Sequence, residues 1–304
     1  MNDKKRVAFV GLGSMGLPMA ENLIRAGHAV RGFDVRAAAM ETLAATGGIR
    51  SANPAEACSG ADVLVLMVVN AEQARSVLLE SGALSSLPQG AHICLMATCP
   101  PDEVKRLADE VEASGRVLVD CPVSGGVVGA KAGALTIMVG APEKAYHAVV
   151  PVLQAMGDKV FHCGPEQGQG AVVKAINQLL CGVHLATAAE ALALGEKAGV
   201  DAATLLEIVS NSAASSWMLK DRGPRMITKT PPVTSAVDIF VKDLGIALAT
   251  GRSVSMALPL AAAAHQMFLA ESGSGNGLED DSQVIAAYRR LNGITLHKRR
   301  ACSN

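Results

Sequence analysis

Short apolar runs alternate with helix-like segments through the first half of the chain. Each run is continuously apolar, which is typical of strands in a parallel sheet that is covered on both faces. The segments between the runs are amphipathic or rich in alanine, which favours helices. The predicted strands are residues 7–10, 29–34, 63–69, 93–96, 117–120, 135–140 and 159–161, and the predicted helices are residues 15–26, 37–45, 71–79, 101–113 and 143–156. This half is therefore predicted to be α/β.

The pattern changes after Gly164 and Pro165. Residues 169–198 form one helical stretch, which would extend about 45 Å at 1.5 Å per residue. Further helices are expected at residues 202–210, 235–249, 259–271 and 281–291, and no strand alternation is visible among them. We predict an α/β domain over residues 1–164 and an all-α domain over residues 165–304, joined by a long interdomain helix.

The strongest local signal is a glycine-rich turn between the first predicted strand and the first predicted helix. Gly11 permits a tight turn, Gly13 lets the backbone approach a pyrophosphate, and Gly16 allows close packing of helix on sheet. The start of the helix adds free N–H groups and a positive dipole end. The predicted cofactor contacts in this turn are Gly11, Leu12, Gly13, Ser14, Met15 and Gly16. A packing turn in an α/β domain without a nucleotide is the alternative.

An acidic residue ends the second predicted strand. Asp34 is placed to accept hydrogen bonds from the adenosine ribose hydroxyls, and its charge would repel a 2′-phosphate. We therefore predict a Rossmann-type, NAD-binding domain. Arg36, two residues later, leaves NADP open as an alternative.

A second glycine pair follows the strand that ends at Asp120. Ser124, Gly125 and Gly126 are expected to form a loop whose N–H groups converge on an anion such as a substrate carboxylate. A turn without a ligand would give the same pattern.

Two polar residues interrupt the apolar start of the long helix. Lys174 and Asn177 are three residues apart and so share a helix face. Apolar surroundings would disfavour the charged form of the lysine, which suits a general acid/base. The alternative is a surface lysine with a buried stem. Lys242, beside Asp243, is a further candidate, although such a neighbouring pair is usually a solvated face.

Composition and charge narrow the classes of function. Half the residues are hydrophobic, so the chain can bury a large core. The net charge of −1 and 3% aromatic content argue against a nucleic-acid binder. Seven cysteines without a C-x-x-C pair favour neither disulfides nor a metal site, and they fit a reducing, cytoplasmic location. Neither a signal peptide nor a membrane span is expected, and the basic tail at residues 297–304 is expected to be a solvated end.

Together these motifs resemble the β-hydroxyacid dehydrogenases, the family that includes 3-hydroxyisobutyrate dehydrogenase and tartronate semialdehyde reductase. Four motifs match in order: residues 11–18, residues 120–126, residues 170–177 and residues 242–244. The resemblance implies NAD as cofactor and a small hydroxy acid as substrate. It further implies that Lys174 is catalytic, that Ser124, Gly125, Gly126 and Asn177 bind substrate, and that Thr98 and Lys242 contact the cofactor.

Four further segments resemble one branch of this family, whose substrate is a four-carbon polyol acid. They are residues 177–184, 211–218, 235–244 and 277–285. Another hydroxy acid of the same family is the main alternative. A catalytically silent dinucleotide-binding module and an imine reductase are the others, and the presence of Lys174 argues against both. The apolar long helix leads us to expect a homodimer or homotetramer.

Overall fold

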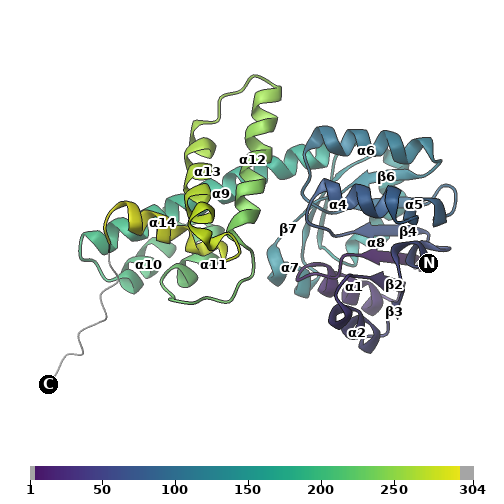
Figure 1. Cartoon of the computed structure of the whole chain (residues 1–304), viewed down its shortest axis with the longest axis horizontal. Helices are drawn as coiled ribbons and strands as arrows, with labels where there is room; N and C mark the ends of the chain where they lie inside the picture. The colour runs from purple at the N-terminus through teal and green to yellow at the C-terminus, as the bar shows by residue number, and fades with distance from the viewer. Residues whose placement is uncertain (1–3, 295–304) are drawn as a thin grey trace. The chain divides into compact units, whose positions relative to one another are not determined.

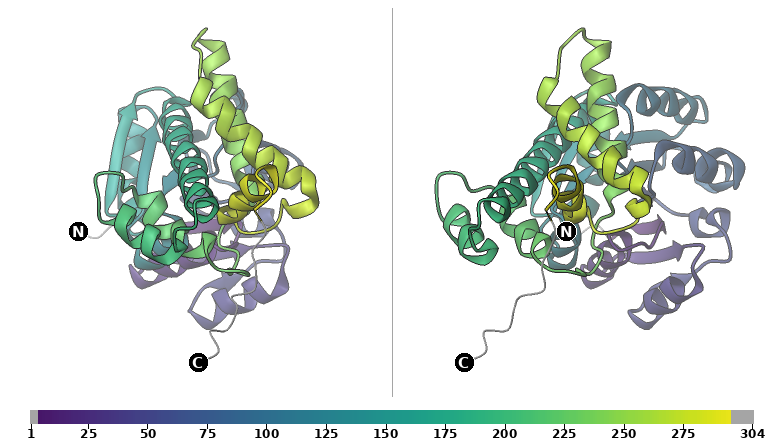
Figure 2. Two further views of the ribbon diagram at one scale, coloured as in Figure 1. Left: turned by 90° about the vertical axis from the view of Figure 1, so that its left-hand side faces the viewer. Right: turned by 60° about the vertical axis from the view of Figure 1, so that its left-hand side comes forward.

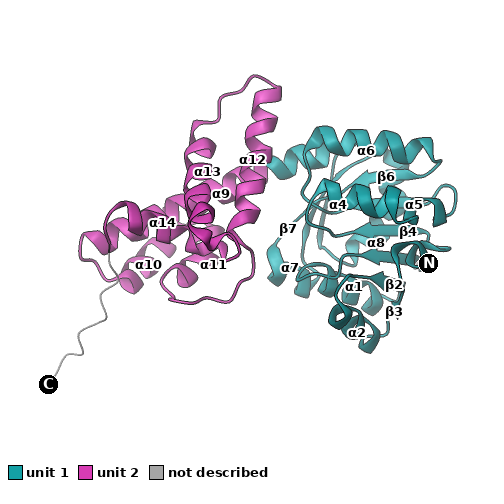
Figure 3. Ribbon diagram, in the orientation of Figure 1, with its two compact units in different colours: residues 1–175 teal, residues 176–304 magenta. Residues whose placement is uncertain are grey.

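The computed structural model describes residues 4–294 (Figure 1). The basic tail therefore lies outside the described residues. The chain divides into two compact units, residues 1–175 and 176–304 (Figure 3). The division falls inside the long helix α9 (Gln169–Lys197), whose first turns pack on unit 1.

Unit 1 is built on one mixed, mostly parallel sheet. Its order is β3-β2-β1-β4-β5-β6-β8-β7, with β9 paired to β8. The strands from β3 to β6 are parallel, and β8 runs antiparallel to both β6 and β7. The bounds are β1 (Arg6–Val10), β2 (Ala29–Phe33), β3 (Ile49–Arg50), β4 (Val63–Leu66), β5 (His92–Leu95), β6 (Val117–Asp120), β7 (Val123–Ser124), β8 (Thr136–Gly140) and β9 (Lys159–Gly164). The strand order reverses between β1 and β4, where open α/β sheets bind ligands.

Helices cover both faces of this sheet. One apolar core lies under α1 (Gly16–Arg25), α2 (Ala37–Ala45), α7 (Gly126–Ala132) and α8 (Glu143–Gln154). The other lies under α3 (Pro54–Cys58), α4 (Ala71–Arg75), η1 (Ser76–Glu80), α5 (Ala83–Ser86) and α6 (Pro101–Ala113). Strand residues alternate between the two cores, as Val63 and Val65 face one and Leu64 and Leu66 the other. Burial on both faces explains the continuously apolar strands.

Several short elements of unit 1 were not predicted. They are β3, β7, α3, α5 and α7, and each spans too few residues to show a periodicity. The strand expected to run to residue 69 ends at Leu66, and the helix expected over residues 71–79 is α4 followed by the π-helical turn η1.

Unit 2 is helical and is organised around the remainder of α9. It contains α10 (Ala202–Ser210), α11 (Trp217–Met226), α12 (Val237–Ser253), α13 (Pro259–Glu271), η2 (Ser272–Asn276), η3 (Asp281–Gln283) and α14 (Val284–Leu291). α12 and α13 pack side by side as a helical hairpin, drawn in light green to yellow in both views of Figure 2. The rings of Phe240 and Phe268 stack between them with centroids 5.0 Å apart.

One helix of unit 2 was missed in the sequence. α11 contains Gly223 and Pro224, which hid its helical pattern. The hydroxyl of Ser216 caps it by accepting a hydrogen bond from the Leu219 amide at 3.0 Å.

The predicted fold class, an α/β dinucleotide-binding domain followed by an all-α domain, is confirmed.

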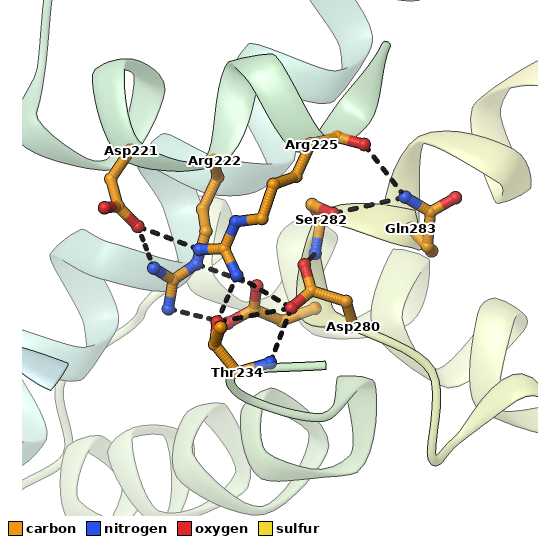
Figure 4. A network of polar contacts seen from close by, with 8 residues as sticks. Asp221, Arg222, Arg225, Thr234, Asp280, Ser282 and Gln283 are labelled. Atoms are coloured by element: carbon orange, nitrogen blue, oxygen red, sulfur yellow. Dashed lines mark hydrogen bonds and ion pairs between the residues drawn. The ribbon is translucent and has the colours of Figure 1, made fainter. Parts of the chain in front are cut away.

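A buried network of charges joins α11 to the segment around η3 (Figure 4). Arg222 makes a two-point contact with Asp281, from Nε at 2.8 Å and from Nη2 at 3.1 Å. It also pairs with Asp221. Asp281 is fully buried, and burial raises the pKa of its carboxyl even though Arg222 opposes that shift.

The second arginine of this network holds the chain that precedes α12. Arg225 donates to Asp280 and to Asp221, each at 2.8 Å. Asp280 also accepts from the Thr234 amide at 3.0 Å. Burial disfavours its charge, but the hydrogen bonds and Arg225 outweigh burial and lower the pKa of Asp280.

Candidate functional site

The glycine-rich turn joins β1 to α1 as predicted. Gly11 has φ +94°, and a Cβ there would lie 2.3 Å from the Met67 carbonyl oxygen. A Cβ on Gly16 would lie 1.9 Å from the Gly11 carbonyl oxygen. Gly13 is different, because the nearest atom to its Cβ position is an Arg36 nitrogen at 3.9 Å. Gly11 and Gly16 therefore close the turn, while Gly13 leaves its outer side clear for a ligand.

Asp34 follows β2 and is bonded to the same turn. One of its oxygens accepts from the Leu12 amide at 2.7 Å, and the other accepts from the Arg36 amide at 2.9 Å. Burial disfavours its charge, but the hydrogen bonds from Arg36 and Leu12 prevail and lower the pKa of Asp34. A hollow of about 520 Å³ opens beside it. An ionised acceptor next to a glycine turn and a helix start fits the ribose and pyrophosphate of a dinucleotide.

Thr98 lies at the same edge of the sheet. It follows β5 and precedes α6, and it is half-buried. The carboxyl ends of parallel β1, β4 and β5 meet at one edge, so Thr98 is on the side of the glycine turn.

The predicted anion loop is a strand-to-helix junction. Ser124 ends β7 and pairs with Thr136 of β8, and Gly126 begins α7. Gly125 has φ +128° and Gly126 has φ +60°, so the chain turns sharply at both residues. The pairing with β8 holds the first residue of the predicted loop, Ser124, while the turn itself lies at Gly125 between β7 and α7.

Lys174 lies in the part of α9 that packs in unit 1, and it is 6% exposed. The alternative of a surface lysine is therefore wrong. Of the apolar residues next to it in sequence, Val173, Ile176 and Leu180 are exposed and so lie on another side of α9. The lysine is on the opposite, buried side of the helix.

Asn177 and Lys242 belong to unit 2 and are linked by a chain of polar contacts. The Asn177 amide donates to Gln178 at 2.9 Å, and Gln178 donates to Asp243 at 2.5 Å. Lys242 pairs with Asp243 at 2.7 Å. Asp243 is only 2% exposed, so the solvated face considered for this Lys-Asp pair is wrong for the aspartate.

Comparisons with known proteins decide the family. Residues 6–164 match the NAD binding domain of 6-phosphogluconate dehydrogenase, and residues 168–288 match the NAD-binding domain of NADP-dependent 3-hydroxyisobutyrate dehydrogenase. The L-threonate dehydrogenase of Cupriavidus necator is 43% identical over 93% of this chain and 96% of its own. The chain belongs to the β-hydroxyacid dehydrogenase family.

Two further relatives agree with this membership. The 3-hydroxyisobutyrate dehydrogenase of Pseudomonas aeruginosa is 37% identical over 93% of this chain and 98% of its own. The crystal structure of a 3-hydroxyisobutyrate dehydrogenase from Salmonella typhimurium superposes with a TM-score of 0.88 at 38% identity, over 92% of this chain and 98% of that one. The resemblance stated from the motifs is confirmed, as is NAD as the cofactor. This β-hydroxyacid dehydrogenase is thus an NAD-dependent oxidoreductase that acts on a CH–OH group.

The structure of this dehydrogenase adds a residue that the sequence did not single out. Asp120, at the end of β6, is 1% exposed and accepts from the amides of Gly168 at 3.0 Å and Ala171 at 2.7 Å. It thereby caps the start of α9, the helix that carries Lys174. Burial raises the pKa of Asp120 to about 7, against the effect of its backbone hydrogen bonds. An aspartate at a strand end five residues before a glycine pair was the available signal, but its partner lies far along the chain.

Gln178 and Asp243 were also missed as members of the polar chain in unit 2. Each stands beside a residue that we did predict, yet the link between them spans 65 positions. One helix among the described residues, α9, is long and apolar enough to cross a membrane by length and composition. Its Leu185 and Leu192 are fully buried in the core of unit 2, which makes it a core helix of a soluble protein.

Proposed function

We propose that this dehydrogenase oxidises the 2-hydroxyl of L-threonate and forms 2-dehydro-L-erythronate, with NAD as the acceptor. The proposal rests on the agreement between the buried Lys174 on α9 and the relatives of 38–43% identity that are named L-threonate dehydrogenase. The branch of the family that four sequence segments indicated is the same one.

Each of the predicted site residues has its own role in this reaction. Lys174, as a neutral amine, takes the proton from the hydroxyl oxygen, and in the reverse direction it returns that proton to the carbonyl oxygen. Ser124, Gly125 and Gly126 bind the substrate carboxylate, and Asn177 orients the substrate. When bound, the nicotinamide supplies the acceptor for the hydrogen that leaves carbon 2 with its electron pair. Asp120 acts through α9 by fixing the turn that precedes Lys174.

The cofactor contacts in this proposal are those predicted from the sequence. Gly11, Leu12, Gly13, Ser14, Met15 and Gly16 bind the pyrophosphate, and Asp34 binds the adenosine ribose. Thr98 and Lys242 lie against the nicotinamide half. The salt bridge with Asp243 holds the Lys242 ammonium in place at 2.7 Å.

The experiment that tests the substrate is a panel of hydroxy acids with NAD, followed by nicotinamide absorbance. We expect the highest kcat/KM with L-threonate. The panel includes 3-hydroxyisobutyrate and, in the reducing direction, tartronate semialdehyde, which are the substrates of the alternative function. High activity with either of these and none with L-threonate would contradict the proposal.

We further propose that the enzyme is a cytoplasmic homodimer or homotetramer. The support is a row of exposed apolar side chains along α9, namely Val173, Ile176, Leu180 and Leu194. Large exposed apolar patches mark surfaces that associate. Sedimentation of the purified protein at several concentrations tests the assembly, and a stable monomer would overturn it.

A further inference from the structure

A buried asparagine joins the helix that follows the glycine turn to the helix that follows the second glycine pair. Asn22 lies in the second turn of α1 and is 5% exposed. Its side-chain amide nitrogen donates to the carbonyl oxygen of Ala130, in α7, at 2.7 Å. The two helices pack against each other within unit 1 (Figure 1). One side chain of α1 is therefore bonded to a helix that lies 108 positions further along the chain.

Helix α7 has few other contacts that could fix its position. Among its seven described residues, Ala130 alone is buried, and Val128 is 69% exposed. Helices in proteins are held mainly by a buried apolar face, and α7 has almost none. Its sequence also includes Gly126 and Gly129, and glycine weakens a helix. A single polar contact therefore has an unusually large share in holding this helix.

Asn22 acts at the C-terminal end of α7. This end is a tight turn in which Gly133 has φ +65° and donates to the Ala130 carbonyl oxygen at 3.3 Å, while Ala134 donates to Gly129 at 2.9 Å. The amide of Asn22 is a further donor to the same Ala130 oxygen. A Cβ on Gly133 would lie 3.5–3.6 Å from the end of the Asn22 side chain. The turn that ends α7 is thus both bonded to Asn22 and packed against it.

The other end of α7 carries the carboxylate loop of the proposed function, which is Ser124, Gly125 and Gly126. Ser124 is paired with Thr136 of β8, and Gly126 is the first residue of α7. The Gly129 amide donates to the Gly125 carbonyl oxygen at 3.0 Å, so the loop is continuous with the hydrogen bonds of the helix. Such a helix moves as a rigid element, so a shift of its C-terminal end re-orients the amides of Gly125 and Gly126.

Helix α1 does not depend on Asn22 in the same way. Its Met19, Ala20 and Leu23 are fully buried in the core under the sheet. The glycine turn before it is closed by contacts of its own, since Gly16 packs on the Gly11 carbonyl. Loss of the bond to Ala130 should therefore displace α7 and leave the start of α1 in place.

We propose that Asn22 is a positioning residue for the substrate, which holds α7 on α1 so that Gly125 and Gly126 meet the substrate carboxylate. The helix that begins at the dinucleotide turn thereby also sets the place of the hydroxy acid. This inference rests on the carboxylate loop of the proposed function, but it does not depend on which hydroxy acid is oxidised, because each acid of the panel carries a carboxylate.

The first test is Asn22→Leu, which keeps the approximate shape of the side chain and removes its donor. We expect the KM of the hydroxy acid to rise about five- to ten-fold, because a buried hydrogen bond is lost and the end of α7 shifts. The value of kcat should change less than KM does. The Kd of NAD, measured by titration calorimetry, should stay at its wild-type value. The acid used is the one that the wild type oxidises with the highest kcat/KM, so a wrong substrate contradicts the proposed function and leaves this test intact.

A second variant displaces the same end of α7 while Asn22 remains. Gly133→Ala puts a methyl group against the Asn22 side chain, in a backbone conformation that favours glycine. We expect the same result, a raised KM for the hydroxy acid with an unchanged Kd for NAD. Agreement between the two variants would assign the effect to the position of α7.

Matched controls come from the end of α14, which carries none of the proposed site residues. Asn292→Leu removes an amide that donates to the Tyr288 carbonyl oxygen at 2.9 Å, and Gly293→Ala strains a glycine with φ +59°. Both should leave the KM of the hydroxy acid unchanged, and thermal unfolding checks that all four variants are folded. An unchanged KM in Asn22→Leu, an equal rise in the Kd of NAD, or the same rise of KM in the controls would each refute the role of Asn22.

Discussion

Different interactions stabilise the interior of each of the two units of this dehydrogenase. Unit 1 is held by two apolar cores on either side of a sheet, and its site is made largely of backbone at a glycine turn. Unit 2 also has an apolar core, but fully buried carboxylates and their arginines tie its helices together. The local structure of unit 1 therefore depends on positions where no side chain fits, and that of unit 2 depends on buried ion pairs.

The largest effect is expected at Lys174. Lys174→Ala should lower kcat by about 10²- to 10⁴-fold, because it removes the group that we propose as general acid/base. The Kd of NAD should change little, since the glycine turn and Asp34 remain. Steady-state kinetics and calorimetry measure the two quantities. Turnover close to that of the wild type would contradict the assignment.

The next prediction tests whether buried charge is what holds unit 2 together. Arg222→Met keeps an unbranched apolar stem but leaves Asp281 buried without its two-point partner. We expect the free energy of unfolding in urea to fall by about 3–5 kcal/mol. Arg6→Met removes an exposed pair with Asp62 in unit 1, and it should change the free energy of unfolding little, because water screens the pair. Equal losses of unfolding free energy in the two variants would contradict this difference between the units.

A third prediction tests the glycine positions of unit 1, where no side chain fits. Gly16→Ala puts a methyl group 1.9 Å from the Gly11 carbonyl oxygen, so the turn has to shift. We expect a loss of stability of about 1–3 kcal/mol and weaker NAD binding. Gly273→Ala is the matched control, because nothing lies within 4 Å of its Cβ position. Thermal unfolding and calorimetry should separate the two variants, and unchanged NAD affinity in Gly16→Ala would be the contrary result.

The last effect is a slope with pH rather than a single loss, and it concerns Asp120 in unit 1. Burial raises its pKa to about 7, above the unfolded value of 3.8, so the folded state binds the proton more tightly. Its contribution to stability is therefore present below pH 4 and is lost as the pH rises toward 7 and through it. Asp120→Asn should remove this slope, which amounts to at most about 1.4 kcal/mol per pH unit. Urea unfolding of both proteins between pH 4 and pH 8 measures it, and parallel curves would rule it out.

The sequence predicted unit 1 better than unit 2 for a physical reason. Strands buried on both faces and a glycine turn leave local signatures, so Gly11, Gly13, Gly16 and Asp34 could all be placed from spacing alone. Their positions in the structure agree with that placement.

The remainder depends on contacts between distant positions. Asp120 caps a helix that begins 49 residues later, and nothing near it in the chain announces that partner. The buried aspartates near η3 look like ordinary surface residues until α11 supplies two arginines. α11 itself was hidden by Pro224, because a proline lacks the N–H that the interior of a helix uses.

Helix α9 fixes how Lys174 and Asn177 lie relative to each other through the number of residues between them. Lys174 and Asn177 are separated by less than one turn of uninterrupted helix. Each residue of an α-helix advances the side chain by about 100°, so one deleted residue between them would turn Asn177 to the face opposite Lys174. Length changes among related enzymes should therefore fall before residue 169 or after residue 197, while the stretch between is altered only by substitution.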